Sequence, residues 1–408
     1  MMEGNIGWKY NKAYFYNLRG DTSNGAILKN QNEELLKIVY DSSSLGQLLD
    51  VWKDIVPGGN FFTIELTTSY PGLITGIGIN HQTTLKWMFE TEGKPIQIPE
   101  FKFGMMFDYT TGLPIIPGSS IKGVLRSFFP IMNQNKFCDC YHEKIDYIAA
   151  ILHKVHQLFV CVKNQEKEEE KLVNDLLLNE YLLKENQSKE KLLELFKKQR
   201  EDEIEEMIGM ISEDEFDELS SSQALITFAE KHLKSEMESF YQSFNRDKKK
   251  DLRKKAEKLY KEKINAILYQ PLEEEEINEE DKIKASCLAS EMFEGKKNEE
   301  CIPIYQRDTF FDAIPVSGDS RADGLLFAKD YIAPHKNLFK DPEPICFMKI
   351  RSNVKFMFSF ILHDGIVSKE EKLMLIKYLL YKNGLGAKTN VGYGQFNSSE
   401  KEILKITK

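Results

Sequence analysis

The 408-residue sequence predicts an α+β protein whose core has the ferredoxin-like order β-α-β-β-α-β and carries a long α-helical insertion. Two observations predict the core: stretches rich in β-branched and aromatic residues, and two amphipathic helical segments that alternate with them. The insertion is predicted by a middle third rich in Glu, Lys and Leu and poor in Gly and Pro. The predicted parts are an N-terminal extension, a first core part, the insertion and a second core part, at residues 1–59, 60–136, 137–300 and 301–408.

Three stretches predict the strands of the core. The first is FFTIELTTS at residues 61–69, and the second is CIPIYQRDTFFDAIPV at residues 301–316. The third, PICFMKIRSNVKFMFSFIL at residues 344–362, predicts a hairpin that turns at residues 351–353.

The first core helix is predicted to begin in the motif PIIPGSSIKGVLRSF, at residues 114–128. Ser119 or Ser120 is expected to cap the helix, and Lys122 and Arg126, four residues apart, share one face. A helix start with free N–H groups and such cations suits a sugar–phosphate backbone; plain capping with surface charges is the alternative. The predicted buried face consists of Ile121, Val124, Leu125 and Phe128.

The second core helix is predicted from SKEEKLMLIKYLLYKN at residues 368–383, and Gly384 is expected to end it. Its predicted buried face consists of Leu373, Leu375, Ile376, Leu379 and Leu380.

A glycine-rich segment, GLGAKTNVGYGQF at residues 384–396, follows this helix. It is not a P-loop, because Ala387 rather than glycine precedes Lys388, and because P-loops and dinucleotide-binding loops run from a strand into a helix. Glycine permits positive φ angles and close approach, so the loop can present backbone N–H groups, Lys388 and Tyr393 to a polynucleotide backbone. A connection without a ligand is the alternative.

The net charge of −9 is concentrated in the insertion. Residues 161–300 hold 25 Lys and Arg against 37 Asp and Glu, whereas the rest of the chain holds 30 against 27. The parts of the chain on either side of residues 161–300 are therefore mildly basic, which permits phosphate binding. The basic stretch at residues 246–261 is expected to be a solvated helix face rather than an RNA contact.

We expect a cytoplasmic protein without a membrane span. The N-terminus lacks a signal-like apolar run, no segment reaches about 18 apolar residues, and six scattered cysteines do not suggest a disulfide framework.

Two constellations bear on enzymatic activity. Cys138, Cys140, His142, His153 and His156 could supply a zinc site, but their spacing matches no standard finger, so we expect no metal and no cofactor. Nuclease chemistry would need a paired general base, and no sequence feature couples the candidate residues, which are Asp108, Asp308, Asp312, His81 and His335.

Five ordered motifs together resemble the RAMP superfamily of type III CRISPR effector complexes. They are PGSSIKGVLRS, FFDAIPV at residues 310–316, DYIAPHKNLF at 330–339, DPEPICFMKI at 341–350 and the terminal glycine loop. The third and fourth most resemble the sixth-subunit family of the Cmr (subtype III-B) complexes.

The resemblance implies an RRM-related core whose helix start and glycine loop hold guide RNA. It further implies a non-catalytic subunit at the head of the complex, near the 3′ end of the guide and the target RNA, beside another head RAMP subunit and the backbone RAMP subunits. A metal-dependent RAMP ribonuclease and a helical scaffold without RNA contact are the alternatives. The predicted RNA-binding residues are Ser119, Ser120, Lys122, Arg126, Arg321, His335, Lys336, Lys388, Thr389, Asn390 and Tyr393.

Overall fold

A computed structural model of the protein falls into two compact units, residues 1–156 with 272–408, and residues 157–271. It describes residues 5–16, 24–41, 59–76, 89–91, 94–96, 100–101, 103–130, 132–133, 136–137, 140–184, 241–244, 246–269, 279–297, 300–332 and 345–397. The domain boundaries expected from the sequence stay predictions.

The described α-helices are α1 (Ile6–Asn11), α2 (Asn24–Leu36), α4 (Gly118–Ser127), α5 (Tyr141–Lys163), α6 (Gln165–Lys184), α12 (Arg246–Tyr269), α13 (Glu279–Ala289) and α14 (Lys369–Asn383). The main strands are β1 (Phe61–Thr68), β10 (Thr309–Phe310), β11 (Ile314–Ser317), β12 (Phe327–Ile332), β13 (Ile345–Ile350), β14 (Lys355–Ile361) and β15 (Phe396–Asn397). The short strands are β2 (Phe89–Thr91), β3 (Lys94–Ile96), β4 (Met106–Phe107), β5 (Pro114–Ile115), β6 (Met132–Asn133), β7 (Lys136–Phe137), β8 (Lys296–Lys297) and β9 (Glu300–Cys301).

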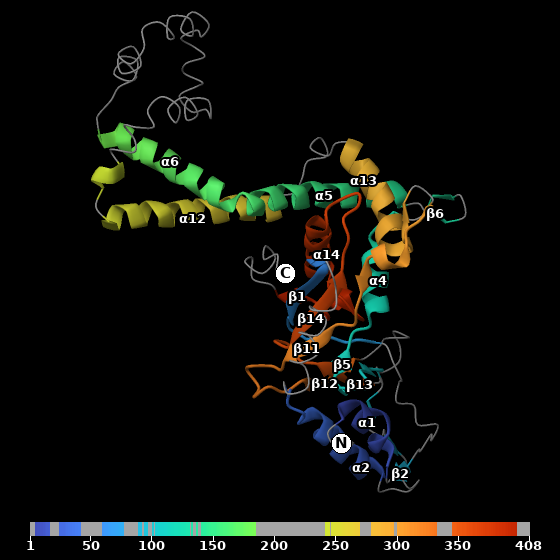
Figure 1. Cartoon of the computed structure of the whole chain (residues 1–408). Helices are drawn as coiled ribbons and strands as arrows, with labels where there is room; N and C mark the ends of the chain where they lie inside the picture. Colours follow the sequence, from blue (N-terminus) through green and yellow to red (C-terminus); the bar gives the residue numbers. More distant parts are fainter. Residues whose placement is uncertain are drawn as a thin grey trace, which may run out of the picture. The chain divides into compact units, whose positions relative to one another are not determined.

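The first unit is built on an antiparallel sheet of order β10-β14-β1-β15, in which β11 also pairs with β14 (Figure 1). Its central strand β14 is buried at five consecutive positions, so both of its faces are covered. Phe358 and Phe360 are fully buried and meet the rings of Phe396 and Phe310. The mixed helix-and-sheet class predicted from the sequence is confirmed.

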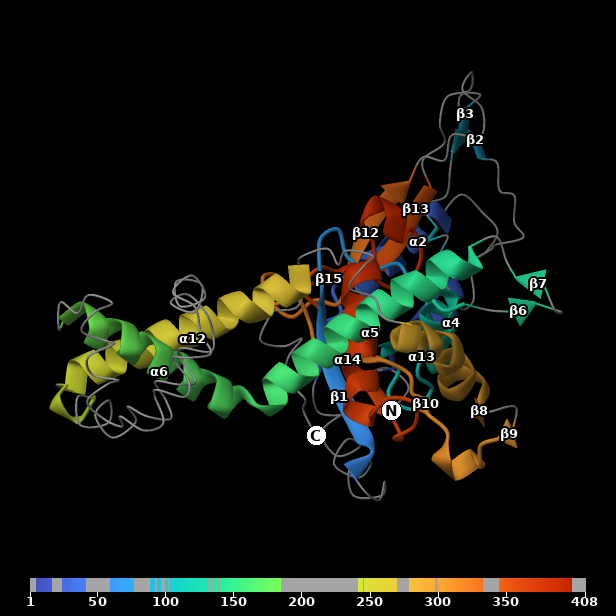
Figure 2. The ribbon, with the colours of Figure 1, turned by 90° about the horizontal axis from the view of Figure 1, so that it is seen from above.

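Both predicted core helices form, and they lie next to each other (Figure 2). Ser368 caps α14 in a reciprocal capping box with Glu371, and Gly384 ends the helix with φ 71°. All five predicted apolar positions of α14 are buried. In α4, Ile121 and Leu125 are fully buried, whereas Val124 and Phe128 are half-buried.

The predicted hairpin at residues 344–362 is wrong. β13 and β14 do form, but β13 pairs with β12, while β14 pairs with β1. Thr68, at the end of β1, prevents the hairpin from forming. Its backbone N–H donates to the Val354 carbonyl, and its own carbonyl accepts from the Asn353 N–H. The Thr68 hydroxyl also donates to the carbonyl of Arg351, so β1 occupies the place where the two strands would have continued together.

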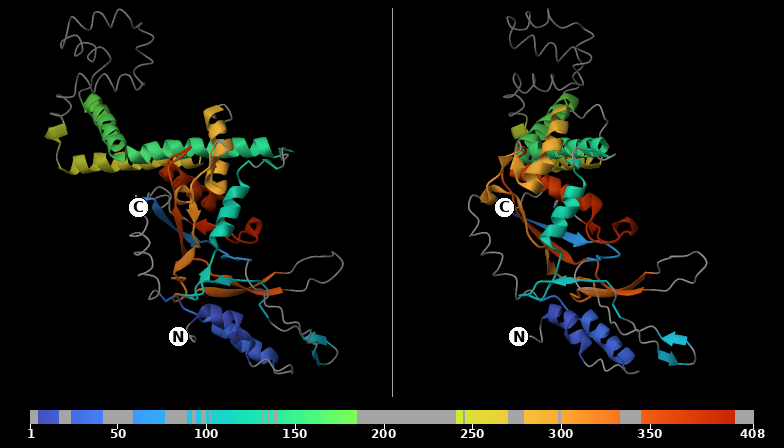
Figure 3. Two further views of the ribbon diagram at one scale, coloured as in Figure 1. Left: turned by 45° about the vertical axis from the view of Figure 1, so that its right-hand side comes forward. Right: turned by 90° about the vertical axis from the view of Figure 1, so that its right-hand side faces the viewer.

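The helices α1 and α2 lie side by side near the β12–β13 hairpin (Figure 3). Tyr14 donates a 2.7 Å hydrogen bond to Asn32 of α2, and Tyr10 donates to the Phe103 carbonyl. The carbonyl of Ile38, two residues after α2, accepts a hydrogen bond from the N–H of Leu326. The N-terminal segment therefore belongs to the same packed body as the strands.

The second unit contains α6 and α12, which run alongside one another. Lys263 of α12 lies 2.6 Å from Glu168 of α6, and Tyr260 donates to the carbonyl of Cys161. The helical character predicted for the described part of the insertion is confirmed.

Among the described residues, one helix, α5, is long and apolar enough to cross a membrane by length and composition alone. Ile148, Leu152 and Val155 of this helix are buried inside the protein, and a core helix passes the same test.

Candidate nucleic-acid interface

The glycine-rich loop is fastened to the segment that follows β1. Gly394 donates to the Gly72 carbonyl and Ala387 donates to the Ile74 carbonyl, each at 2.8 Å. The backbone N–H of Ser69 bonds the Gln395 carbonyl at 2.9 Å. The loop is thus held at both of its sides by residues 69–76, whose role the sequence analysis missed. The Pro-Gly pair at residues 71–72, directly after a predicted strand, was the available signal.

The tip of the loop presents a cation and unpaired backbone donors. Lys388 has φ 60° in the left-handed region and begins a short 3-10 turn of Thr389, Asn390 and Val391. Lys388 and Asn390 are exposed. Within the described part of the chain, the N–H groups of Lys388, Thr389 and Asn390 have no acceptor. Successive free N–H groups beside a lysine form a concavity suited to an anion such as a phosphate.

Tyr393 lies behind the loop instead of at its tip. It is 8% exposed, packs with Ile74 and Phe347, and donates a 2.8 Å hydrogen bond to Asp330. Burial is the main cause that raises the pKa of Tyr393, followed by Asp330 and then by Tyr70. The tyrosine therefore supports the loop, and a direct contact from it to RNA stays a prediction.

Asp330 receives a second partner, because Lys349 of β13 forms an ion pair with the same carboxylate. Burial by itself would raise the pKa of Asp330, but the hydrogen bonds from Lys349 and Tyr393 outweigh it and hold that pKa below its usual range. No local pattern predicted this group, because its members come from three separate segments.

The predicted serine cap of α4 is wrong. The helix begins at Gly118 after Pro117, so Ser119 and Ser120 lie within its first turn. The capping group is Asp312, whose carboxylate accepts the Gly118 N–H at 2.8 Å from a segment nearly two hundred residues away. Because a carboxylate already occupies this helix start, an anionic ligand has less to gain there than the sequence suggested.

One face of α4 is nevertheless open and basic. Ser119, Lys122, Gly123 and Arg126 follow one another at helical spacing and are exposed or half-buried. Arg126 lies 2.5 Å from Glu294, an ion pair in which both side chains are more than a third exposed. The Lys122 side chain has no hydrogen-bond or ion-pair partner among the described residues.

The helix start and the glycine loop do not form one site. Gly118 touches Phe310, which shares a row of the sheet with Phe62 at the beginning of β1. The loop returns at Phe396, which pairs with Thr68 at the end of β1. Six residues along a strand correspond to about 20 Å, so a single phosphate cannot bridge the two places.

Arg321 lies in an exposed turn organised by a buried carboxylate. Asp319 is 3% exposed, bonds the N–H of Arg321 and accepts from Arg351 at 2.9 Å. Desolvation would raise the pKa of Asp319, but the bonds from Arg351, Arg321 and Asn353 outweigh it and lower that pKa. The Arg321 side chain is exposed. His335 and Lys336 lie outside the described residues.

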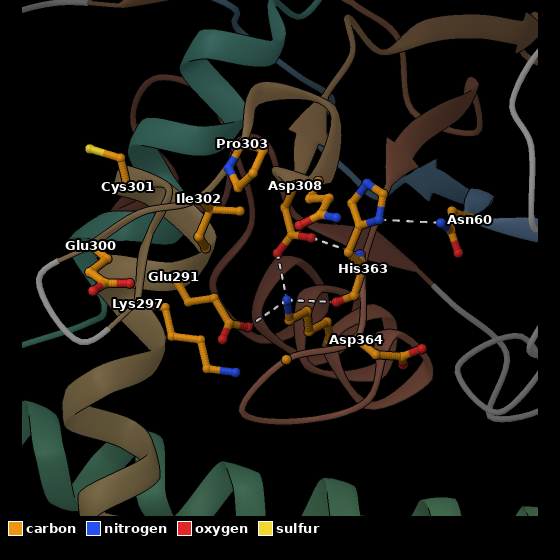
Figure 4. A pocket seen from close by; sticks show the side chains of 13 residues that line it. Asn60, Glu291, Lys297, Glu300, Cys301, Ile302, Pro303, Asp308, His363 and Asp364 are labelled. Atoms are coloured by element: carbon orange, nitrogen blue, oxygen red, sulfur yellow. Dashed lines mark hydrogen bonds and ion pairs between the residues drawn. The ribbon is translucent and has the colours of Figure 1, made fainter.

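A polar pocket of about 680 Å³ lies at the other end of β14 (Figure 4). At its base the buried ammonium of Lys372 meets Glu291 at 2.7 Å and Asp308 at 2.8 Å, and it donates to the His363 carbonyl. Desolvation raises the pKa of Asp308 although Lys372 opposes it, and desolvation lowers the pKa of the His363 imidazole. The carboxylates are committed to an internal lysine and to backbone N–H groups, as in a structural ion-pair network.

The other candidate acids and metal ligands are similarly engaged. Asp108 accepts hydrogen bonds from Thr110 and Thr111. His153 lies 3.2 Å from Asp281 and His156 lies 2.8 Å from Glu371, so the pair bonds carboxylates on two different helices. No group of three or more metal-ligating side chains occurs within the described ranges, which include Cys140 and His142 but neither Cys138 nor His81.

A helix-and-sheet core with a fastened, cation-bearing glycine loop defines an α+β protein with a candidate polynucleotide interface. The chain belongs to the RAMP superfamily, whose sequence profile matches residues 65–397. A segment of it is 33% identical over 100 residues to the CRISPR system Cmr subunit Cmr6 of Pyrococcus furiosus. That match covers 21% of this chain and 29% of the relative's length. The predicted resemblance to the sixth-subunit family is confirmed.

Two solved structures are also similar to this chain. One is a cryo-EM structure of the Type III-B Cmr-beta bound to cognate target RNA, with a TM-score of 0.39, 14% identity, and coverage of 94% of this chain and 78% of the other. The second is the crystal structure of Cmr6 from Pyrococcus furiosus, with a TM-score of 0.29, 17% identity, and coverage of 83% and 98%.

Proposed function

We propose that this chain is a non-catalytic, RNA-binding subunit of a type III-B CRISPR (Cmr) effector complex. In this role it holds the 3′ region of the guide RNA, and the guide–target duplex, at the head of the complex for antiviral defence. The likeness to Cmr6 supports this assignment, together with the geometry of the glycine loop.

The core is proposed to be ferredoxin-like and RRM-related. In chain order the sheet strands are β1, β10 with β11, β14 and β15, and their spatial order β15-β1-β14-β10 supports the ferredoxin-like arrangement. In this reading α4 and α14 are the two crossover helices, and the β12–β13 hairpin is an addition between the second and third strands.

The observation that carries the RNA-binding role is the fastened tip of the glycine loop. Its three free N–H groups and the exposed Lys388 offer donors and positive charge at one place, which is the chemistry of a phosphate contact. Because three backbone hydrogen bonds hold the loop to residues 69–76, these donors are arranged before RNA arrives. Such a loop loses little conformational entropy on binding.

The open face of α4 supplies a second, separate contact. Lys122 and Arg126, with Ser119 and Ser120 beside them, would meet the backbone of the same strand about 20 Å from the loop. Arg321 would contribute a cation from its exposed turn. Arg126 must exchange its partner Glu294 for a phosphate, so we expect Lys122 to contribute more to affinity than Arg126.

Guide RNA, target RNA, the backbone RAMP subunits and the other head RAMP subunit are the proposed partners, in the cytoplasm and without a membrane. The helical insertion is proposed to add a protein–protein contact. Deleting residues 164–271, which leaves α13 and Glu291 in place, should weaken assembly, and unchanged assembly would refute this part.

The test is co-purification from cells that express the neighbouring CRISPR genes. Tagged full-length protein is compared with a Lys122→Ala, Arg126→Ala, Lys388→Ala variant and with the control Lys297→Ala, an exposed lysine at the pocket end of the sheet. Wild type and control should bring down a short guide RNA and other RAMP subunits, and the triple variant should lose the RNA. RNA affinity of the purified protein should fall with rising salt, without cleavage.

Three results would count against the proposal. If the wild-type protein is purified without RNA or other subunits, the proposal that it belongs to a complex is refuted. If all samples contain equal amounts of RNA, the assignment of Lys122, Arg126 and Lys388 as RNA-binding residues is refuted. Divalent-metal-dependent cleavage of the RNA would favour the ribonuclease alternative.

A further inference from the structure

Tyr70 is an exposed aromatic side chain placed by the turn that follows β1. The turn is closed by a 2.7 Å bond from the Gly72 N–H to the Ser69 carbonyl, and the Tyr70 side chain is 86% exposed. Among the residues that the structure describes, its hydroxyl has no hydrogen-bond partner. Single exposed aromatic residues are common on protein surfaces, so the location of this one decides its significance.

The turn that carries Tyr70 borders the glycine loop. Ser69 bonds the Gln395 carbonyl through both its N–H and its hydroxyl, at 2.9 and 3.0 Å. Gly72 accepts from Gly394, and a β-carbon at Gly392 would lie 3.6 Å from the Pro71 ring. Tyr70 is therefore fixed on the rim of the loop that bears the free N–H groups.

The loop tip adds an apolar surface to this rim. Val391, one residue after the free donors, is 62% exposed, and Lys388 projects from the same turn. Proteins that bind single-stranded nucleic acid combine a cationic path for the backbone with aromatic rings on which the bases stack. Tyr70, Val391 and Lys388 supply an aromatic ring, an apolar side chain and a cation from two segments held together by hydrogen bonds.

We propose that the ring of Tyr70 stacks on a nucleobase of the single-stranded RNA whose phosphates meet the Lys388 loop. This inference rests on the proposed RNA-binding function and adds to it a base contact. Every base has a π face, so the contact is tolerant of sequence and should act on any single strand that occupies the loop. A duplex at this place would have its bases already stacked and would gain nothing from the ring.

The test uses the full-length protein and a fluorescein-labelled single-stranded RNA of about 12 nucleotides, within the range of single-strand site sizes. Fluorescence anisotropy gives the dissociation constant for wild type, Tyr70→Ala, Tyr70→Phe, Lys388→Ala and the control Tyr305→Ala. Tyr305 is 78% exposed in another part of the unit. An abasic ribose-phosphate strand of equal length serves as the second probe, and thermal unfolding verifies that each variant folds.

We expect Tyr70→Ala to weaken RNA binding about tenfold and to leave binding of the abasic strand unchanged. Tyr70→Phe and Tyr305→Ala should bind as wild type does, because stacking needs the ring and not the hydroxyl. Ultraviolet cross-linking of the wild-type complex should attach the RNA to the peptide that contains Tyr70.

Four outcomes would overturn the inference, and they are distinguishable. If Lys388→Ala weakens binding while Tyr70→Ala does not, the loop binds phosphates without a base stack, and the proposed function survives alone. If Tyr70→Ala weakens both probes equally, the ring acts by supporting the loop. Failure of the wild type to bind either strand would refute the proposed function and this inference together, and loss of a co-purifying protein with Tyr70→Ala would identify Tyr70 as a subunit contact.

Discussion

The ammonium nitrogen of Lys372 lies 2.8 Å from a carboxylate oxygen of Asp308, and each side chain is only 2% exposed. Glu291 is the third member of this buried group, at 2.7 Å from the same nitrogen. The Asp308 carboxylate also accepts the N–H of His363, and Glu291 accepts that of Ile366. The three charges thus connect the first turn of α14 to the segment before β10 and to the π-helical turn Ser290–Glu294, which follows α13.

Replacing Lys372 should be strongly destabilising. Lys372→Met leaves two carboxylates buried beside each other without a cation, and we expect the free energy of unfolding to fall by about 3–5 kcal/mol. Urea denaturation followed by circular dichroism measures this. Lys382→Met, an exposed lysine in the last turn of the same helix, should change the value by less than about 0.5 kcal/mol. Equal effects of the two substitutions would show that the buried pair is unimportant.

Replacing either of two glycines in α4 by alanine should change the stability of the protein, in opposite directions. A β-carbon at Gly118 would lie 2.1 Å from the Phe310 carbonyl oxygen, whereas a β-carbon at Gly123 meets no described atom within 4 Å. Gly118→Ala should therefore destabilise the protein by about 1–3 kcal/mol. Gly123→Ala should stabilise it by about 0.5–1 kcal/mol, because alanine is the better helix former. Thermal unfolding of both variants checks this, and a stabilising Gly118→Ala would contradict the close contact.

The environment of Asp319 predicts a loss of stability in acid. The pKa of Asp319 is lower in the folded protein than in the unfolded chain, where it is about 3.9. The stabilisation that its carboxylate contributes to the folded state is therefore present above the unfolded pKa and is lost as the pH falls through the folded pKa. Asp319→Asn should be less stable at neutral pH and should lose less stability below about pH 4. Urea midpoints across this pH range measure it. Asp323→Asn, an exposed aspartate of the same turn, should retain the wild-type profile, and an unchanged profile in Asp319→Asn would refute the assignment.

Tyr393→Phe separates a supporting role from direct RNA contact. The substitution removes the hydrogen bond to Asp330, and we expect a loss of about 1–3 kcal/mol in the free energy of unfolding. RNA affinity under conditions where both proteins are folded should stay the same, because the hydroxyl lies behind the loop. Tyr305→Phe is the control for stability. A large loss of RNA affinity with unchanged stability would instead support the contact predicted from the sequence.

The sequence alone located the elements whose signals are local. The Ser368 cap, the apolar spacing and the final Gly384 of α14 all act within one helix, so the sequence predicts that helix nearly residue by residue. The same holds for β1, predicted at residues 61–69 and observed at Phe61–Thr68. The glycine-rich segment was also placed correctly, directly after this helix.

The pairing of the strands could not be predicted from nearby sequence alone. The pattern at residues 344–362 contains two strands and a turn, and a hairpin is the simplest interpretation. Whether adjacent strands pair depends on which distant segment offers a better partner, and here Thr68 bonds into the turn and diverts them. β12 had no separate place in the predicted order for the same reason.

The candidate interface likewise combines properties that the sequence predicts with others that only the tertiary structure decides. Its residue types, a lysine and glycines in a loop and cations on a helix face, follow from the sequence because glycine conformation and helical spacing are local properties. Only the tertiary structure decided that Asp312 caps α4, that Tyr393 lies buried on Asp330, that Tyr70 borders the loop and that the helix start and the loop adjoin opposite ends of β1. Those relationships join segments far apart in the chain, and they arise because burial and hydrogen bonding in the folded state select contacts that no local pattern encodes.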